Sequence, residues 1–237
     1  GYRIMSGAGT GTPAVSPSTV TAQELIDDTI RPALDDALAA EFTDTELLSF
    51  LNEAVREYTQ HFPRIAETII AAVAGETRYA LPWDATAVIS VEHPVGNDPP
   101  TWLRRWSKRA AGFAHIRAYD IEWTHDLTAA PALLLSFAPE TGTSLAVRTI
   151  RPHDSALTAS SNLTVPARHH HVLIQYVLFA ATRQLQAREQ AAPTNNSSLL
   201  MAQLASNTRR LELAYLNALN RILSQQLGEG EIFSWDW

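Results

Sequence analysis

The spacing of apolar residues divides the chain into a helical beginning, a β-rich middle and a helical end. Near the beginning, Thr21–Glu24 and Thr43–Glu46 have the form of a capping box, in which a Thr hydroxyl and a Glu carboxylate bind free backbone N–H groups at a helix start. Apolar residues follow each box at helical spacing. Pro32 is expected to interrupt or kink the first helix, and Pro63 to end the second. The two capped helices predict a helical hairpin.

Between about Glu67 and Asn162 the apolar period shortens to that of β-strands. Turn residues such as Gly75-Glu76 separate the apolar runs, and no helix of crossover length lies between them. Several short strands connected in this way predict an antiparallel sandwich or barrel. The predicted strands are Ile69–Val73, Thr77–Leu81, Ala87–His93, Tyr119–Thr124, Ala132–Phe137 and Ser144–Ile150.

Helical spacing returns at Pro166. A nearly all-apolar helix follows, which we expect to be central, and a longer helix runs from about Ser198 to Leu227. The predicted fold is therefore α+β: a helical bundle of two N-terminal and two long C-terminal helices with an inserted antiparallel β sandwich or barrel. The expected parts are an extended N-terminal arm (1–19), the two bundle halves (20–65 and 164–227), the β insertion (66–163) and an extended C-terminal docking tail (228–237).

The composition excludes several classes of function. The chain has no cysteine, which rules out thiol redox catalysis, thiolate zinc sites and disulfides. Its formal net charge is −7, and an acidic chain without a long basic run is a poor candidate for holding nucleic acid. No uncharged apolar stretch reaches the roughly 18 residues of a membrane span, and the first residues lack the pattern of a secretion signal.

Candidate catalytic and metal-binding residues are few. His169, His170 and His171 are consecutive, and successive helical side chains point about 100° apart, so one ion cannot easily bind all three. A partly buried helix start is the simpler interpretation, and a site shared between subunits stays open. We find no nucleophile elbow, phosphate loop or zinc-binding helix motif. The sequence predicts no catalytic, cofactor-binding or metal-binding residue, and therefore no enzyme.

The predicted β region contains four tryptophans. On an exposed surface they could stack on sugar rings, whereas in a small sandwich they more often belong to the core or to an interface. These residues are Trp83, Trp102, Trp106 and Trp123.

The C-terminal tail alternates aromatic and polar residues. In an extended chain, Phe233, Trp235 and Trp237 lie on one face, with Ile232 just before them. A short terminal segment cannot bury such a face by itself. Two interpretations stay open: the tail folds back onto its own bundle, or it docks into a groove or sheet edge of a partner, with the tryptophans as anchors.

The order of these parts resembles the head-to-tail adaptor (connector) proteins of tailed bacteriophages. The resemblance covers most of residues 20–227, and the order of the motifs carries more weight than any one of them. The motifs are the helix Thr21–Arg31, the run FTDTELLSFLNEA (42–54), the turn GETRYALP (75–82) and the segment LTVP (163–166) before a long helix.

The resemblance implies a structural virion protein that forms a ring, typically of twelve copies, beneath the portal. Such a ring joins capsid to tail and extends the channel through which genome DNA passes without sequence-specific binding. The implied partners are the portal protein, neighbouring copies and a downstream neck or tail protein, with no membrane. The implied location is the neck of the virion, after assembly in the host cytoplasm. The implied portal-docking residues are Ile232, Phe233, Trp235 and Trp237.

Two rival functions stay open. Another neck or tail-completion protein, such as a stopper, differs from an adaptor mainly by its neighbours, and the long helical pair after the β region favours the adaptor. A rival from a different class is a carbohydrate-binding β module on a helical stalk, which would use Trp102, Trp106 or Trp123.

Overall fold

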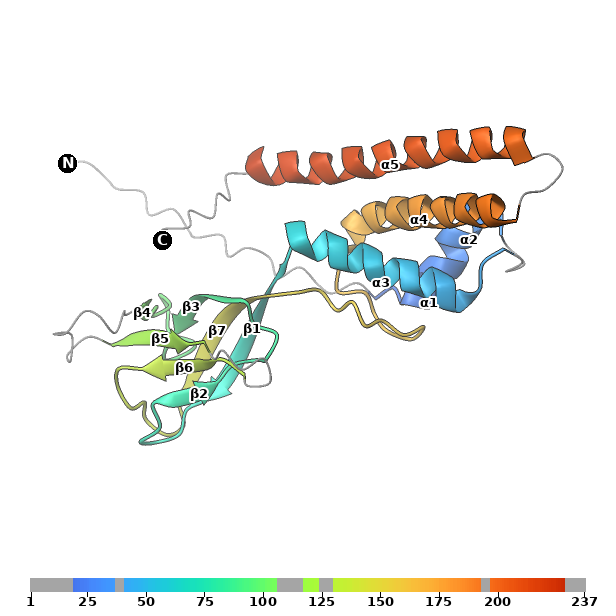
Figure 1. Cartoon of the computed structure of the whole chain (residues 1–237). Coiled ribbons are helices and arrows are strands. Elements are labelled where there is room, and N and C mark those ends of the chain that lie inside the picture. The colour runs from blue at the N-terminus through green and yellow to red at the C-terminus, as the bar shows by residue number, and fades with distance from the viewer. Residues whose placement is uncertain (1–18, 37–40, 106–116, 124–129, 193–196, 229–237) are drawn as a thin grey trace, which may run out of the picture. The chain divides into compact units, whose positions relative to one another are not determined.

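The computed structural model describes residues 19–36, 41–105, 117–123, 130–192 and 197–228 (Figure 1). The chain forms two compact units. The first, here called the helical unit, comprises Gly1–Val55 and Asp154–Trp237, and the second, here called the β unit, comprises Arg56–His153. The combination of helices and sheets confirms the predicted α+β class. Among the described residues, no helix has the length and apolar character needed to span a membrane.

The first helical segment begins at the predicted capping box and widens before Pro32. Thr21 Oγ1 accepts a hydrogen bond from the Glu24 N–H at 3.2 Å, and the Thr21 N–H donates to Glu24 Oε2 at 2.8 Å. Pro32 has no N–H, and its ring needs room near the carbonyl group four residues earlier, so a wider π-helical turn accommodates it. The segment consists of α1 (Ala22–Leu25), the π-helical η1 (Ile26–Ile30) and α2 (Arg31–Leu34).

A buried ion pair joins this segment to the start of the next helix. Arg31 Nη1 lies 3.0 Å from Asp36 Oδ2, and the two side chains are 6% and 2% exposed. The same nitrogen donates to the Phe42 carbonyl at 3.1 Å, and Arg31 also pairs with Asp44. Asp36 accepts the backbone N–H groups of Glu41 and Phe42 at 2.9 and 3.1 Å. These contacts fix the place where the next helix begins.

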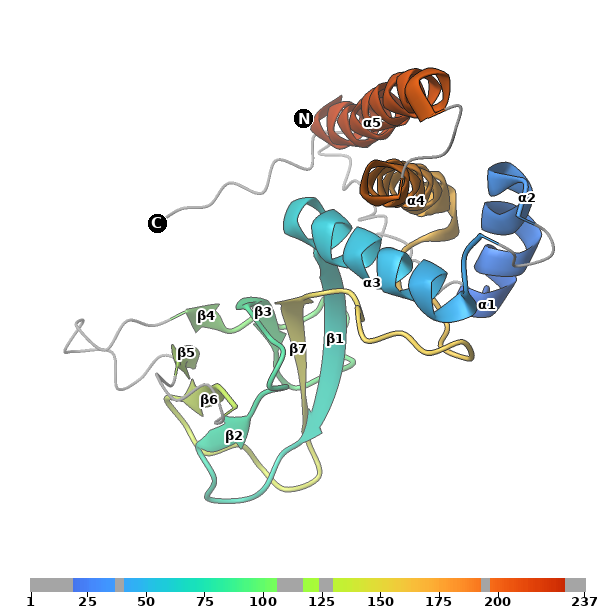
Figure 2. The ribbon, with the colours of Figure 1, turned by 45° about the vertical axis from the view of Figure 1, so that its right-hand side comes forward.

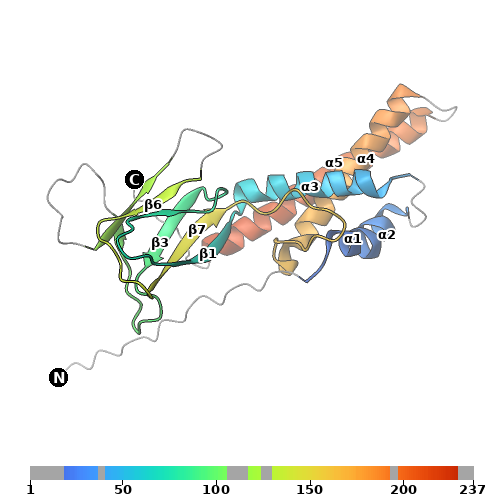
Figure 3. The same cartoon turned by 90° about the horizontal axis from the view of Figure 1, so that it is seen from below.

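Three long helices form a layer in the helical unit, which includes the first of them as far as Val55. They are α3 (Asp44–His61), α4 (His170–Ala191) and α5 (Ser197–Gly228), and a short 3-10 helix, η2 (Ala167–His169), leads into α4. In the helical unit α4 lies between α3 and α5 (Figures 1 and 2). Figure 3 shows α1 and α2 beside the N-terminal half of α3. The second predicted capping box is confirmed at the start of α3, because Thr43 and Glu46 exchange hydrogen bonds.

The core of the helical unit joins α1, η1, α3, α4 and the segment that precedes α4. Its apolar side chains are nearly inaccessible to solvent, and Asn52 of α3 binds the backbone of Leu157, accepting its N–H at 2.9 Å. The largest of these core side chains are Ile26, Ile30, Phe42, Leu47, Leu51, Leu163 and Leu173.

The β unit contains two sheets that share one hydrophobic core (Figure 2). Its strands are β1 (Arg64–Ala71), β2 (Arg78–Ala80), β3 (Ala87–Glu92), β4 (Arg104–Arg105), β5 (Ala118–Glu122), β6 (Ala132–Leu135) and β7 (Ser144–Arg151). The strand order is β1-β7-β3 in one sheet and β2-β6-β5-β4 in the other. Val91 and Val147 of the first sheet and Leu133 of the second all belong to the shared core. Each sheet therefore buries one face against the other.

Two features of the β unit differ from the sequence prediction, and the sequence makes no prediction of which strands share a sheet. The consecutive strands β1 and β2 lie in different sheets, because Gly75, with φ +82°, turns the chain from one sheet into the other. The pairing of β4 with β5 is parallel, so the antiparallel prediction is wrong for that pair. About a dozen residues connect these two strands, which is enough chain to return in the same direction. The strand β1 also begins earlier than predicted, at Arg64.

Candidate assembly interface

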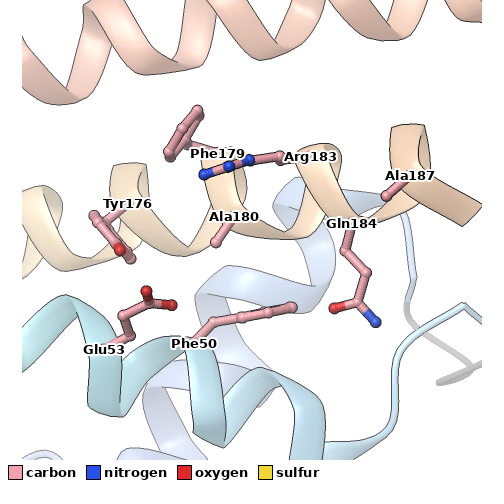
Figure 4. Close-up of a pocket in the computed structure, with 8 residues that line it drawn as sticks. All are labelled: Phe50, Glu53, Tyr176, Phe179, Ala180, Arg183, Gln184 and Ala187. Carbon is pink, nitrogen blue, oxygen red and sulfur yellow. The ribbon is translucent and has the colours of Figure 1, made fainter.

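A groove with an aromatic lining lies between α3 and α4 (Figure 4). Its volume is about 260 Å³. Its lining residues are Phe50 and Glu53 from α3 and Tyr176, Phe179, Ala180, Arg183, Gln184 and Ala187 from α4. The α4 residues recur at spacings of three and four, so they form one stripe along that helix. Tyr176 also packs edge-on against Tyr215 of α5, with ring centroids 5.2 Å apart. The stripe of α4 thus forms the floor of the groove, with α3 beside it.

Polar contacts fix the separation of α3 and α4 at one end of this groove. Glu46 accepts a hydrogen bond from Gln184 at 2.9 Å and forms an ion pair with Arg188. The Arg188 guanidinium also lies 5.4 Å from the ring centre of Phe42. Hydrogen bonds from Thr43 are the largest cause that lowers the pKa of Glu46, with Gln184 and Arg188 as smaller causes. The lowered pKa keeps this carboxylate ionised, which maintains the link between the two helices.

Two charged side chains of the groove, Glu53 and Arg183, are exposed and have no partner in the described part of the chain. The aromatic side chains of Phe50, Tyr176 and Phe179 are half-buried between them. The lining includes no histidine, cysteine, serine or threonine, so it offers none of the usual pairs of nucleophile and base. The groove is suited to binding apolar side chains, with one carboxylate and one guanidinium available for ion pairs.

The outer face of α5 carries leucines that no described residue covers. Leu219 and Ile222 are 6% and 2% exposed, whereas Leu213 and Leu216 are 53% and 43% exposed. Leu199, near the start of the helix, is also exposed. Adjacent exposed leucines on a helix form a surface that further apolar residues, from this chain or another, can cover.

The β unit has a second exposed apolar surface, on the outward face of the β1-β7-β3 sheet. Ile65 and Ile69 of β1 are each more than half exposed, and β1 is an edge strand. On the same face, Arg148 of β7 pairs with Glu67 at 3.0 Å and lies 5.2 Å from the ring centre of Trp102. An edge strand with apolar side chains is a favourable place for another chain to bind.

The histidine triplet builds the start of α4. His169 and His170 are buried, and His170 Nε2 donates to the Val165 carbonyl at 3.0 Å. His171 is exposed and its Nδ1 donates to the Arg168 carbonyl at 2.9 Å. Burial lowers the pKa of His170. No three His, Asp or Glu side chains of the described residues gather as a metal site. The interpretation of the triplet as a partly buried helix start is confirmed.

A further buried histidine lies in the β unit. His93 is 3% exposed, its Nε2 lies 3.1 Å from Thr143 Oγ1, and its ring packs at 5.2 Å from that of Phe137. Its Nδ1 is buried and has no hydrogen-bond partner among the described residues. Burial, and secondly the positive charge of Arg117, lower the pKa of His93. A neutral imidazole is therefore the form that the fold accommodates.

The described tryptophans of the β unit lie outside its core. Trp83 is 84% exposed, and Trp102 and Trp123 are each 44% exposed, while Trp106 lies outside the described residues. Of the two structural roles considered from the sequence, core or interface, only an interface role fits the three described tryptophans.

The predicted docking residues of the tail are not part of the described structure, which ends at Gly228. The same holds for the arm up to residue 18. The docking role of the tail stays a prediction. The residues concerned are Ile232, Phe233, Trp235 and Trp237.

The sequence predicted neither the groove between α3 and α4 nor the exposed leucines of α5. Phe50 and Phe179 occur within helical runs whose spacing predicts burial, so the sequence does not distinguish a half-buried groove residue from a core residue. Leu213 and Leu216 leave a clearer signal. Leu213, Leu216 and Leu219 recur every three residues, and each step rotates by about 60° around the helix, so these leucines cover more of the helix than one buried face needs.

The chain was compared with known protein families. The model of one family, described as SU10 adaptor protein, matches residues 20–227. This range contains the groove, the outer face of α5 and the exposed sheet face. A comparison with curated proteins found no match.

Proposed function

The chain belongs to the SU10 adaptor protein family, and from this premise we propose that it is a head-to-tail adaptor of a tailed bacteriophage. Such a structural protein of the virion works by being bound on two sides, by the portal protein and by the next neck or tail component. The observation that carries the proposal is the extent of the family match. It runs through both the helical unit and the β unit, so it concerns the whole arrangement rather than one motif.

The adaptor forms a ring of copies beneath the portal, twelve in number as in the proteins it resembles. The surfaces of both units support an assembled state, because each exposes large apolar side chains that a solitary soluble protein would cover. The low charged fraction of 18% has the same explanation, since surfaces between permanent partners lose charged residues.

The C-terminal tail is the portal-docking segment, and the β unit contacts the downstream component. The tail supports this role by its alternating sequence, in which Phe233, Trp235 and Trp237 share one face of an extended chain, preceded by Ile232. The exposed sheet face around Ile69 supports the second role. The arm of residues 1–19 has no assigned contact.

Genome DNA passes through the ring without being held. Each copy carries a net charge of −7, and a ring of such copies repels a polyanion more than it binds it. As an adaptor beneath the portal, the protein resides in the neck of the virion, after assembly in the host cytoplasm.

A capture experiment tests the adaptor function. The tagged full-length chain and a chain that ends at Gly228 are each isolated from assembling particles, and the co-purifying proteins are identified by mass spectrometry. We expect the portal protein with the full-length chain and not with the truncated one. Portal protein with both chains would keep the adaptor function and reject the tail as its docking segment. No virion protein with either chain would reject the adaptor function.

Another neck or tail-completion protein is the nearest alternative, and the same capture experiment identifies it by a different set of partners. A carbohydrate-binding module is favoured only by the exposure of Trp102 and Trp123. Binding to immobilised glycans that is lost on changing these two residues to alanine would support it.

A further inference from the structure

The two edges of the three-helix layer carry opposite charge. The helix α3 has four carboxylates and one arginine, a formal net charge of −3. Two of these carboxylates, Asp44 and Glu46, are paired with arginines of other elements, which leaves Glu53, Glu57 and Arg56. The helix α5 has three arginines and one glutamate, a formal net charge of +2. Because α4 lies between them, the acidic helix α3 and the basic helix α5 form opposite edges of the layer within one copy (Figure 1). A layer of this kind attracts a second copy of itself edge to edge.

The basic edge combines its charge with exposed leucines. At about 100° per residue, Arg209, Leu213 and Leu216 fall within about 60° of one another on the outer face of α5. Arg209 has no ion-pair partner in the described part of the chain, although the protein as a whole is acidic. Arg221 is also exposed and unpaired among the described residues, but it lies about 120° around the helix from Arg209. The row of Arg209, Leu213 and Leu216 is thus a distinct surface.

The acidic edge combines its charge with the aromatic groove. Phe50, Tyr176 and Phe179 give the groove an apolar floor and wall, and Glu53 stands beside them, exposed and without a partner in the described residues (Figure 4). The groove also contains Arg183, and Glu53 is its one acidic group, so Glu53 is the group that an arginine of an apolar row would pair with. Neither surface matches itself, because the groove has no counterpart on the outer face of α5.

We propose that the outer row of α5 in one copy binds the α3–α4 groove of the next copy, with Leu213 and Leu216 against Phe50 and Phe179, and Arg209 paired with Glu53. The contact joins two different surfaces, so it can repeat from copy to copy. The copies close into a ring when the rotation between neighbours is a whole fraction of 360°. The proposal rests on the proposed ring and identifies the surfaces that build it. The helices then extend the layer around the ring, α5 of each copy beside α3 of its neighbour.

Charge exchange between the two surfaces tests the ion pair. The full-length chain carries Glu53→Arg, Arg209→Glu or both, with Arg221→Glu as a control of equal charge change off the row. Assembly is measured by sedimentation velocity over a concentration series, alone and with purified portal rings. We expect each single exchange on the two surfaces to raise the concentration needed for assembly at least tenfold, and the double exchange to restore it. The Arg221→Glu chain should assemble like the unchanged protein.

Cross-linking tests the geometry independently, because the chain has no cysteine of its own. In the Glu53→Cys, Leu213→Cys double variant, oxidation should give a ladder of covalent multimers on non-reducing gels. Within one copy these positions lie on α3 and α5, which α4 separates (Figure 1). Because packed helix axes lie about 8–10 Å apart, two helices on either side of a third are too far apart for a disulfide. Each single variant should give no ladder.

The outcomes separate the contact from the ring itself. If the chain assembles but the single exchanges do not weaken assembly, or the double exchange does not restore it, the contact is overturned and the ring stands. A covalent dimer from the Leu213→Cys chain alone would indicate a two-fold contact and would also overturn it. If the unchanged chain stays a monomer both alone and with portal rings, the proposed ring is rejected and the contact with it. Circular dichroism spectra of all variants confirm that they are folded.

Discussion

Replacing Arg31 by methionine should destabilise the helical unit strongly, because it leaves a buried carboxylate without its counter-charge. The Asp36 side chain is 2% exposed and lies 3.0 Å from Arg31. After the substitution Asp36 keeps the N–H groups of Glu41 and Phe42 but loses the guanidinium, and the Phe42 carbonyl loses its hydrogen bond. Removing one partner of a buried ion pair costs about 3–5 kcal/mol. In a chain of this size that corresponds to a fall in Tm of about 6–20 °C.

The exposed partner of the same arginine provides a matched comparison. Asp44 is 63% exposed, so Asp44→Asn should cost at most about 1 kcal/mol. The double variant Arg31→Met, Asp36→Asn should be more stable than Arg31→Met alone, because it removes the buried negative charge and keeps an amide oxygen that can accept a backbone N–H. Burial, rather than the number of contacts, thus decides the expected order of the three variants.

Urea and thermal unfolding followed by far-UV circular dichroism measure these effects, since the signal is dominated by the helices. All variants are compared at one protein concentration, because assembly also stabilises the folded state. The slope of the urea transition must stay constant for the free energies to be comparable. A loss below about 1 kcal/mol for Arg31→Met, or an equal loss for Asp44→Asn, would refute the reasoning that the buried pair dominates.

Three further predictions concern acid sensitivity, a helix cap and the β core. Burial lowers the pKa of His93 and His170, so these imidazoles bind a proton at a higher pH in the unfolded chain than in the folded one. Their contribution to the free energy of unfolding should therefore be fully present above about pH 6.5 and be lost as the pH falls through the lowered pKa values. Thermal unfolding across this range should show the decline, and His170→Gln should reduce it. Thr21→Ala removes one side of a capping box and should cost about 1 kcal/mol by urea unfolding. Leu145→Ala, in the shared core of the sheets, should cost about 2–5 kcal/mol, read by tryptophan fluorescence, and no loss there would contradict the assigned core.

The sequence could predict the parts of this fold that depend on neighbouring residues. A capping box needs only four consecutive positions. Both predicted boxes form, one at Thr21–Glu24 and the other at Thr43–Glu46. The change from helical to alternating periodicity, and back again near Pro166, is also local. It depends on whether apolar residues recur about one helical turn apart or at every second position. These local patterns are enough to establish the α+β class and the place of the β region between two helical parts.

Tertiary structure decided which surfaces meet, because partners distant in sequence compete for the same apolar faces. The pattern that predicts β1 and β2 contains nothing that assigns them to different sheets, and the turn at Gly75 could equally have preceded a hairpin. Phe50 and Phe179 have the spacing of core residues, yet they remain half-buried because α3 and α4 are held by polar contacts such as Glu46 with Arg188. The leucines of α5 exceed what its contact with α4 can cover. The sequence of a segment determines the periodicity of its apolar residues. Burial depends on two packed surfaces, so the same segment does not determine which partner covers it.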